Sequence, residues 1–211
     1  MDVITRITRQ RGRCIVTVND SENLQVPLGL LRERPLQEGQ EINLEEYDNW
    51  LMVRQYRYAL DRAVGYLAAR ACSRGEIESK LLRIGYRPST VEMVLYKLER
   101  ENLLDDADFA RQWVEARSTK RLGRSRIAQE LRRKGVSAVD AEEALSAIDD
   151  EDQLSGAVGL ARKAAARIKP GEDPRKAASR IGGMLARRGY SWDIAREAIR
   201  TAMEDVDMDE L

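Results

Sequence analysis

The segment from Arg117 to Lys134 carries the side chains best suited to binding chemistry. It holds eight cations against a single carboxylate, Glu130, and the cations are Arg117, Lys120, Arg121, Arg124, Arg126, Arg132, Arg133 and Lys134. Guanidinium and ammonium groups form charge-assisted hydrogen bonds with phosphates and carboxylates. Because neighbouring like charges repel one another on a helix, we interpret this cluster as a contact surface for an acidic or phosphate-rich partner.

The composition excludes several kinds of catalytic site. The chain has no histidine, so Ser-His and Cys-His nucleophilic sites and histidine-containing zinc sites are impossible. Its two cysteines, Cys14 and Cys72, are isolated, which is typical of reduced thiols. No GxxxxGK[ST] nucleotide-binding loop occurs. We therefore predict that the chain is not an enzyme and uses no cofactor and no metal.

The apolar residues are too scattered for a membrane segment. No apolar run approaches the ~18 residues that a spanning helix needs, and the N-terminus lacks the basic and apolar regions of a signal peptide. We expect a cytoplasmic monomer without membrane contacts.

Three stretches of the chain repeat one pattern, which indicates an array of similar units. The first is Leu81, Gly85, Val91, Val94 and Leu95, the second is Leu131, Gly135, Ala141, Ala144 and Leu145, and the third is Leu185, Gly189, Ala195, Ala198 and Ile199. The three glycines fit the left-handed position just after a helix. The sequence predicts a mainly α fold with three tandem three-helix modules in an elongated array, preceded by a small antiparallel β region.

The expected domains follow from changes in periodicity. Short β-branched runs separated by turn residues predict a β-rich extension at 1–50, including a short helix over 27–33. Three-helix modules are expected at 51–102, 103–149 and 150–205, and an acidic tail at 206–211.

Helix starts are predicted by capping residues. Asn43 with Glu46, Ser73 with Glu76, and Ser89 with Glu92 resemble capping boxes. Asp105 is an expected N-cap, with Phe109 placed to close a hydrophobic staple against Leu104, so both motif residues are interpreted as structural. Asp173 and Pro174 predict another helix start.

Charge is unevenly distributed among the expected helices. Basic residues concentrate on the first and second helices of each module, whereas residues 140–152 hold seven acidic residues and no basic one. Such segregation suits a nucleic-acid backbone or an acidic protein groove. The carboxylates of third helices, such as Glu92 and Glu99, argue against base reading by a helix-turn-helix mechanism.

Several motifs resemble the RecX regulatory family, over about residues 54–204. They are Leu60-Asp61-Arg62-Ala63, Leu104-Asp105-Asp106 to Phe109-Ala110 followed by Arg117, residues 123–135 (GRSRIAQELRRKG), and residues 185–190 (LARRGY). The resemblance implies a bacterial cytoplasmic protein with three tandem three-helix modules. It also implies that the chain binds RecA protomers and the groove of the RecA filament on single-stranded DNA. Inhibition of RecA would then affect recombination, DNA repair and the SOS response.

Two other functions stay open from the residues themselves. One is a helical module that binds single-stranded DNA without RecA, and the other is a helical scaffold for an unrelated partner. The aromatic residues Trp113, Tyr86 and Tyr190 are interpreted as packing residues rather than as base-stacking platforms.

Overall fold

An antiparallel sheet begins the chain. In the computed structural model, residues 1–169 and 171–209 are described, with side chains as far as Glu204. The strands are β1 (Asp2–Gln10), β2 (Arg13–Val18), β3 (Glu22–Pro27) and β4 (Glu41–Ile42), in the order β3-β2-β1-β4. Alternate side chains of β2 are buried, namely Cys14, Val16 and Val18, because successive residues of a strand point to opposite faces. The predicted β region is confirmed.

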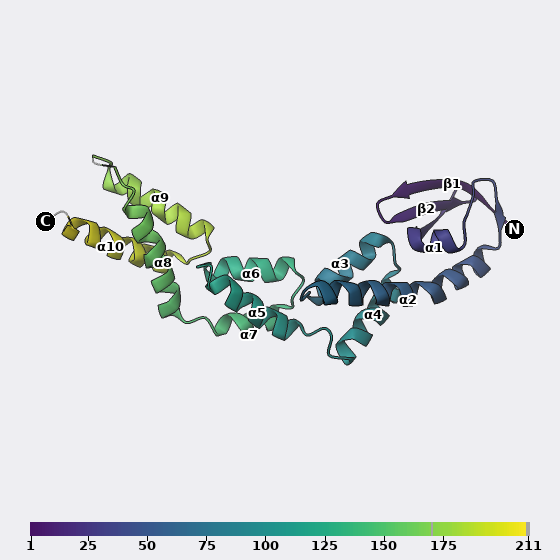
Figure 1. Ribbon diagram of the computed structural model, residues 1–211. Coiled ribbons are helices and arrows are strands. Elements are labelled where there is room, and N and C mark those ends of the chain that lie inside the picture. The colour runs from purple at the N-terminus through teal and green to yellow at the C-terminus, as the bar shows by residue number, and fades with distance from the viewer. Residues whose placement is uncertain (170, 210–211) are drawn as a thin grey trace. The chain divides into compact units, whose positions relative to one another are not determined.

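Helices α1 (Leu28–Glu33) and α2 (Leu44–Ala69) cover this sheet (Figure 1). The side chain of Asn43 caps α2 by accepting a hydrogen bond from the amide of Glu46. Tyr47 and Leu51, early in α2, belong to the core of the sheet. Ala59 lies further along and belongs to the core of the first module. The boundary expected at residue 50 therefore falls inside a helix that both regions share.

The first module is completed by α3 (Arg74–Ile84) and α4 (Pro88–Arg100). The capping box of Ser73 and Glu76 is formed as predicted. The box predicted for Ser89 and Glu92 is wrong. Helix α4 begins at Pro88, without a side-chain cap, because proline suits the first helical turn, where its missing N–H leaves no bond unmade. The carboxylate of Glu92 instead accepts a hydrogen bond from Arg74.

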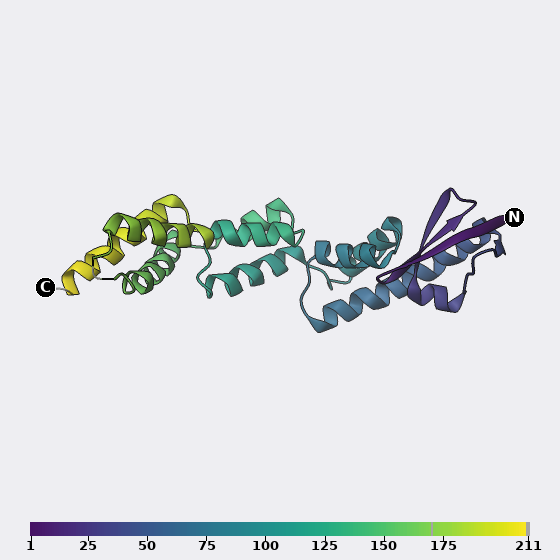
Figure 2. The same cartoon turned by 90° about the horizontal axis from the view of Figure 1, so that it is seen from above.

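The other two modules form the second unit of the chain, Asp106–Leu211. The second module contains α5 (Asp106–Ser118), α6 (Arg124–Arg133) and α7 (Ala138–Ser146). The third contains α8 (Asp150–Ala165), α9 (Pro174–Arg187) and α10 (Trp192–Asp209). The two bundles are drawn in teal to green and in green to yellow (Figure 2). Asp173 caps α9 and Pro174 is its first residue, as predicted.

Each module has its own core. Ile127 and Leu131 are completely buried in the second module. The core of the third module consists largely of alanines, among them Ala157, Ala161 and Ala198. Small side chains let helix backbones approach closely, so α8 and α10 share the most extensive helix–helix packing in the described part of the chain.

The repeated glycines occupy left-handed turns, as predicted. The φ angles of Gly85, Gly135 and Gly189 are +101°, +77° and +91°. A Cβ atom is costly in this region of φ, which explains why glycine recurs after the second helix of each module. Tyr86 and Tyr190 follow two of these turns and are buried, as expected.

The junction at Asp105 separates two cores. Asp105 directly precedes α5. Leu104 is buried in the core of the first module and Phe109 in that of the second. Each side chain is therefore buried within its own module, and the staple expected between them stays a prediction.

The C-terminal helix continues into the region where we expected an acidic tail. Helix α10 runs to Asp209, so residues 206–209 are helical. The last two residues of the expected tail, Glu210 and Leu211, lie outside the described residues. No helix among the described residues combines the length and apolar character needed to cross a bilayer.

Candidate partner-binding surface

Glu130 organises the basic cluster of the second module. This carboxylate lies on α6 with a side chain only 14% exposed, and it accepts a hydrogen bond of 2.6 Å from the Nε of Arg117. The indole Nε1 of Trp113 donates to it at 3.2 Å, and Arg126 forms an ion pair with it at 3.5 Å. The single acidic residue of the cluster therefore forms ion pairs with two of its cations.

The pKa of Glu130 reflects these contacts. Burial alone raises the pKa of the carboxyl group. Hydrogen bonds from Arg117 and Trp113 and the charges of Arg117 and Arg126 lower the pKa, and together they outweigh the effect of burial. The pKa of Glu130 consequently lies below its usual value, and the carboxylate stays ionised at neutral pH.

The indole ring of Trp113 lies close to two of the predicted contact residues, Arg117 and Lys134. The guanidinium carbon of Arg117 lies 3.9 Å from the centre of the indole ring, and the Nζ of Lys134 lies 4.0 Å from it. Phe109 stacks on the same indole at 5.7 Å. Cations near an indole face are attracted by its π electrons. Arg117 and Lys134 are therefore held against the core of their own module, and Trp113 packs as expected.

The N-terminus of α6 docks on the third module. The amide of Gly123 donates to the carbonyl of Arg188 at 2.8 Å, and the amide of Ser125 donates to the carbonyl of Gly189 at 3.2 Å. The amide of Arg124 donates to Oε1 of the buried Gln153 at 3.0 Å. The amides that a helix N-terminus could offer to a phosphate are thus already used here.

Arg121 links the same two modules. Its backbone adopts a left-handed φ of +52°. Its carbonyl accepts a hydrogen bond of 3.0 Å from the hydroxyl of Tyr190. Its guanidinium lies against Gly159 of α8, where an added Cβ would come within 2.8 Å of Nη1. The neighbouring Lys120 presents its carbonyl to Arg188 and leaves its own side chain exposed.

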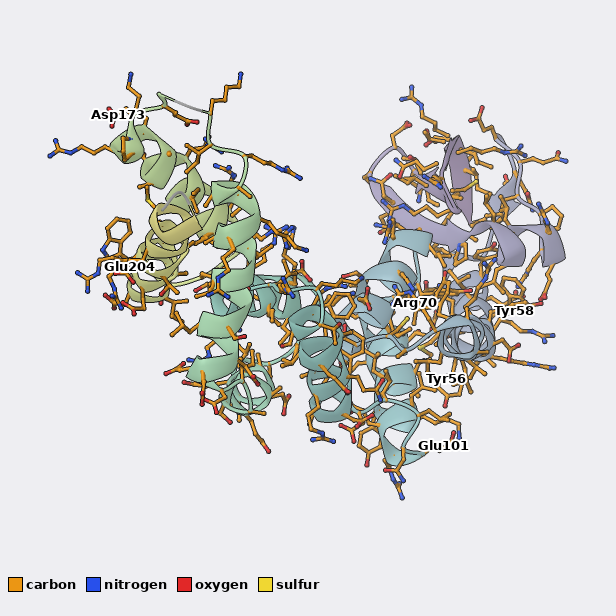
Figure 3. All side chains as sticks on the ribbon, turned by 60° about the vertical axis from the view of Figure 1, so that its left-hand side comes forward. Tyr56, Tyr58, Arg70, Glu101, Asp173 and Glu204 are labelled. Carbon is orange, nitrogen blue, oxygen red and sulfur yellow. The ribbon has the colours of Figure 1, made fainter. Side chains whose placement is uncertain are left out.

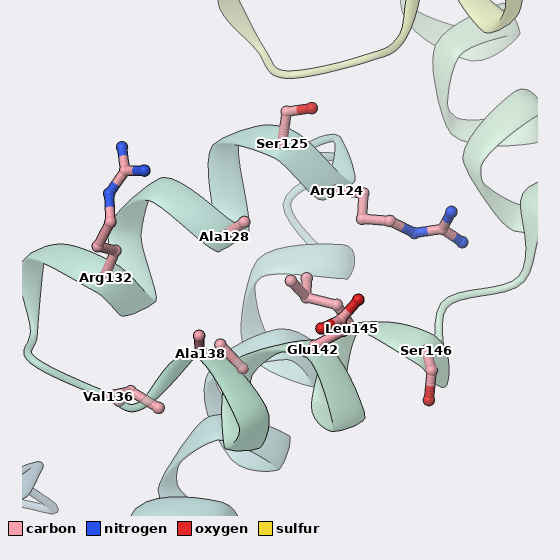
Figure 4. Close-up of a pocket in the computed structure, with 10 residues that line it drawn as sticks. Arg124, Ser125, Ala128, Arg132, Val136, Ala138, Glu142, Leu145 and Ser146 are labelled. Atoms are coloured by element: carbon pink, nitrogen blue, oxygen red, sulfur yellow. The ribbon is translucent and has the colours of Figure 1, made fainter.

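A groove runs between α6 and α7 (Figure 4). It has a volume of about 720 Å³ and a largely apolar wall that includes Ala128, Ala141 and Leu145. Arg124 and Arg132 stand at the two ends of the α6 wall. Arg124 donates to the carbonyl of Ile148 at 2.6 Å and pairs with Asp150 at 3.0 Å.

The predicted cations therefore divide into two groups. Five make specific contacts within the second unit, and they are Arg117, Arg121, Arg124, Arg126 and Lys134. Lys120, Arg132 and Arg133 are exposed, and they form no ion pair with any residue that the structure describes. Arg132 and Arg133 lie in the last turn of α6, where the helix dipole favours positive charge.

The sequence did not predict the roles of Gly123 and Gln153 in the contact between the second and third modules. Gly123 has an ordinary φ of −76°, so no turn pattern singles it out. Its role is a close backbone approach to Gly189. Gln153 resembles any polar helix residue, and only its burial marks it.

Modules of three helices, each with a left-handed glycine turn after its second helix, define the chain as a helical repeat protein. Comparisons with known proteins identify the family. Family models of the three RecX three-helix domains match this chain. The model of the first domain matches residues 59–98, that of the second residues 105–145 and that of the third residues 150–199. The chain belongs to the RecX family of regulatory proteins, as its motifs led us to expect.

Relatives and solved structures agree with this assignment. Regulatory protein RecX of Prosthecochloris aestuarii is 38% identical over 144 residues, which cover 68% of this chain and 92% of the relative. That of a Mycobacterium species is 39% identical over 137 residues, covering 63% and 75%. A crystal structure of RecX from Lactobacillus salivarius matches with a TM-score of 0.65 at 26% identity, covering 71% of this chain and 97% of the other. Another, of a regulatory protein RecX, has a TM-score of 0.64 at 25% identity and covers 95% and 100%.

Proposed function

We propose that this chain is a non-enzymatic inhibitor of the RecA recombinase. It binds RecA protomers along the groove of the filament on single-stranded DNA, and so restrains recombination, DNA repair and the SOS response. It acts as a cytoplasmic monomer. The choice of RecA rests on membership of the RecX family.

The observation that carries the proposal is the set of three exposed cations on the second module. Lys120, Arg132 and Arg133 meet no carboxylate among the described residues. Cations that their own chain leaves unneutralised are available to phosphates or carboxylates of a partner. The five contacting cations, Arg117, Arg121, Arg124, Arg126 and Lys134, stay candidates whose positions are set by the module itself.

The test is RecA-dependent ATP hydrolysis on single-stranded DNA with this protein added. Reversing the charge of the exposed pair, Arg132→Glu with Arg133→Glu, should weaken inhibition at least about tenfold, equivalent to about 1.4 kcal/mol. The matched control is Arg83→Glu with Arg187→Glu, because both positions correspond to Arg133 in the other modules. Inhibition by the control should stay within about twofold of the wild type.

The outcomes separate the function from the surface. If the wild-type protein leaves ATP hydrolysis unchanged, the inhibitor proposal is overturned. If both double variants inhibit equally well, the basic cluster is not the contact surface.

The same three cations favour a second candidate, a module that binds single-stranded DNA without RecA. Binding of this kind should weaken with salt, with a log–log slope of about −0.7 for each phosphate contacted. Salt titrations with and without RecA distinguish the two functions. Equal retention on DNA in both titrations would favour the second candidate.

A further inference from the structure

An exposed apolar surface lies on the first module, away from the basic cluster in sequence. Met93 and Tyr96 project from α4, and each is 59% exposed. They border a surface hollow of about 420 Å³ together with Tyr56 of α2. We name this surface the α2–α4 face, and its residues are Tyr56, Met93, Tyr96, Lys97, Arg100 and Glu101. Figure 3 labels Tyr56 of α2 and Glu101, the residue that follows α4.

The equivalent positions of the other two modules show which residue types occur when this helix face is exposed to solvent. Positions 93 and 96 correspond to Glu143 and Ser146 in the second module. In the third module they correspond to Glu197 and Arg200, which form an ion pair with each other. Charged and polar residues are the usual choice for a solvated helix face. The first module alone exposes a methionine and a tyrosine there, so its face differs from its own structural equivalents.

The charges of the face are incompletely matched. Lys97 pairs with Glu101 at 2.6 Å. The guanidinium carbon of Arg100 instead lies 5.9 Å from the ring centre of Tyr96, and Arg100 forms no ion pair with any residue that the structure describes. An exposed guanidinium beside an apolar surface is complementary to a partner that brings a carboxylate next to an apolar side chain.

We propose that the α2–α4 face is a docking surface for a protein segment. The segment places an apolar side chain among Tyr56, Met93 and Tyr96, and it brings a carboxylate to Arg100. The inference rests on the proposed function, because it takes the segment to belong to the recombinase. It assigns to the first module a contact that is separate from the basic cluster.

A protein fits this face better than a nucleic acid does. Tyrosine, methionine and arginine are the residues enriched at the centres of protein interfaces. Base stacking needs a free aromatic plane, whereas the guanidinium of Arg100 lies near the ring of Tyr96.

A reciprocal exchange between modules tests the docking surface. The variant Met93→Glu with Tyr96→Arg installs the ion pair of the third module and leaves the net charge unchanged. The control, Glu197→Met with Arg200→Tyr, makes the opposite change in the third module. Binding to RecA filaments on single-stranded DNA is measured as a dissociation constant. The first variant should bind at least about tenfold more weakly, and the control should bind within about twofold of the wild type.

Folding is controlled in two ways. All substituted side chains of the face are at the surface, so the melting midpoint and helicity should not change. A single charge reversal, Arg100→Glu, provides a second test and should also weaken binding at least about threefold, whereas Arg100→Lys should retain most of it.

Each outcome has a defined meaning. If wild-type protein does not bind RecA, the proposed function fails and the docking surface fails with it. If wild-type protein binds and both variants of the face bind equally well, the docking surface alone is overturned. If the exchange weakens binding to single-stranded DNA in the absence of RecA, the face is a nucleic-acid surface, and the protein-docking proposal is rejected.

Discussion

Gly123 and Gly189 meet backbone to backbone at the junction of the second and third modules. A Cβ atom on Gly123 would lie 2.2 Å from the carbonyl carbon of Gly189, and one on Gly189 would lie 2.3 Å from the amide nitrogen of Arg126. The closeness lets the amides of Gly123 and Ser125 bond to the α9–α10 turn. The junction is therefore built from main-chain hydrogen bonds, and a side chain at either glycine would require the backbone to shift.

Replacing Gly123 should weaken this junction. We expect Gly123→Ala to lower the free energy of unfolding by about 1–3 kcal/mol, because backbone atoms must move to admit the methyl group. Urea unfolding followed by circular dichroism measures the change. The control is Gly65→Ala in α2, where no atom beyond the neighbouring backbone of the helix itself lies within 4 Å of the added Cβ. This change inside a helix should raise the free energy of unfolding by about 0.5–1 kcal/mol. Equal stabilities for the two variants would contradict the close approach.

Gly135→Val tests the left-handed turn of the second module. Its φ of +77° is unfavourable for a β-branched residue, so the substitution should cost about 1 kcal/mol or more. Differential scanning calorimetry should show a lower melting midpoint. An unaltered midpoint would mean that the turn relaxes without strain.

Glu130→Gln tests the centre of the basic cluster. The substitution leaves the half-buried Arg117 and Arg126 facing a neutral amide oxygen in place of a carboxylate, and loss of this charge should cost about 1–3 kcal/mol at neutral pH. Arg111→Gln is the control, since it removes an exposed pair with Asp108 that should contribute less than about 1 kcal/mol.

The effect of Glu130 should depend on pH. Because the pKa of Glu130 is lower in the folded chain than in the unfolded chain, its stabilisation is complete above the unfolded pKa. It is lost as the pH falls through the folded pKa. The difference in unfolding free energy between wild type and Glu130→Gln should therefore shrink on acidification below about pH 4.5. A difference that stayed constant down to about pH 2 would show that the carboxylate is not stabilised by its cations.

Tyr190→Phe removes one hydrogen bond between the two modules of the second unit. The hydroxyl donates to the carbonyl of Arg121 and Tyr190 is a buried residue, so loss of the hydrogen bond should cost about 0.5–1.5 kcal/mol. Hydrogen exchange of the amides of residues 119–125 should become faster, because the Arg121 turn loses its anchor. Exchange in α3, in the other unit, serves as the internal reference and should not change.

Local patterns of the chain predicted most of the helices and their ends. The capping of α3 by Ser73 and of α9 by Asp173 depends on residues within one turn of the helix start, so sequence proximity is sufficient. The start of α4 was missed because two local signals competed, and the proline at position 88 took the first helical position in place of a Ser89 cap.

For the candidate surface, the sequence predicted only which basic residues it contains. The sequence identified the cations from Arg117 to Lys134 as a group, but their individual environments depend on distant residues. Gly159, which lies against the side chain of Arg121, is 38 residues further along the chain. Patterns of residues close together in the sequence cannot predict a contact between residues so far apart in the chain.

By itself, the sequence determined the three repeated modules, their glycine turns and the total charge of the basic segment, because each follows from spacing or from composition. Tertiary structure alone decided which cations Glu130 and Trp113 retain, that Gly123 must be a glycine, and that Met93 and Tyr96 stay at the surface. These properties depend on which side chains packing brings together or leaves exposed, and that depends on contacts between residues far apart in the chain.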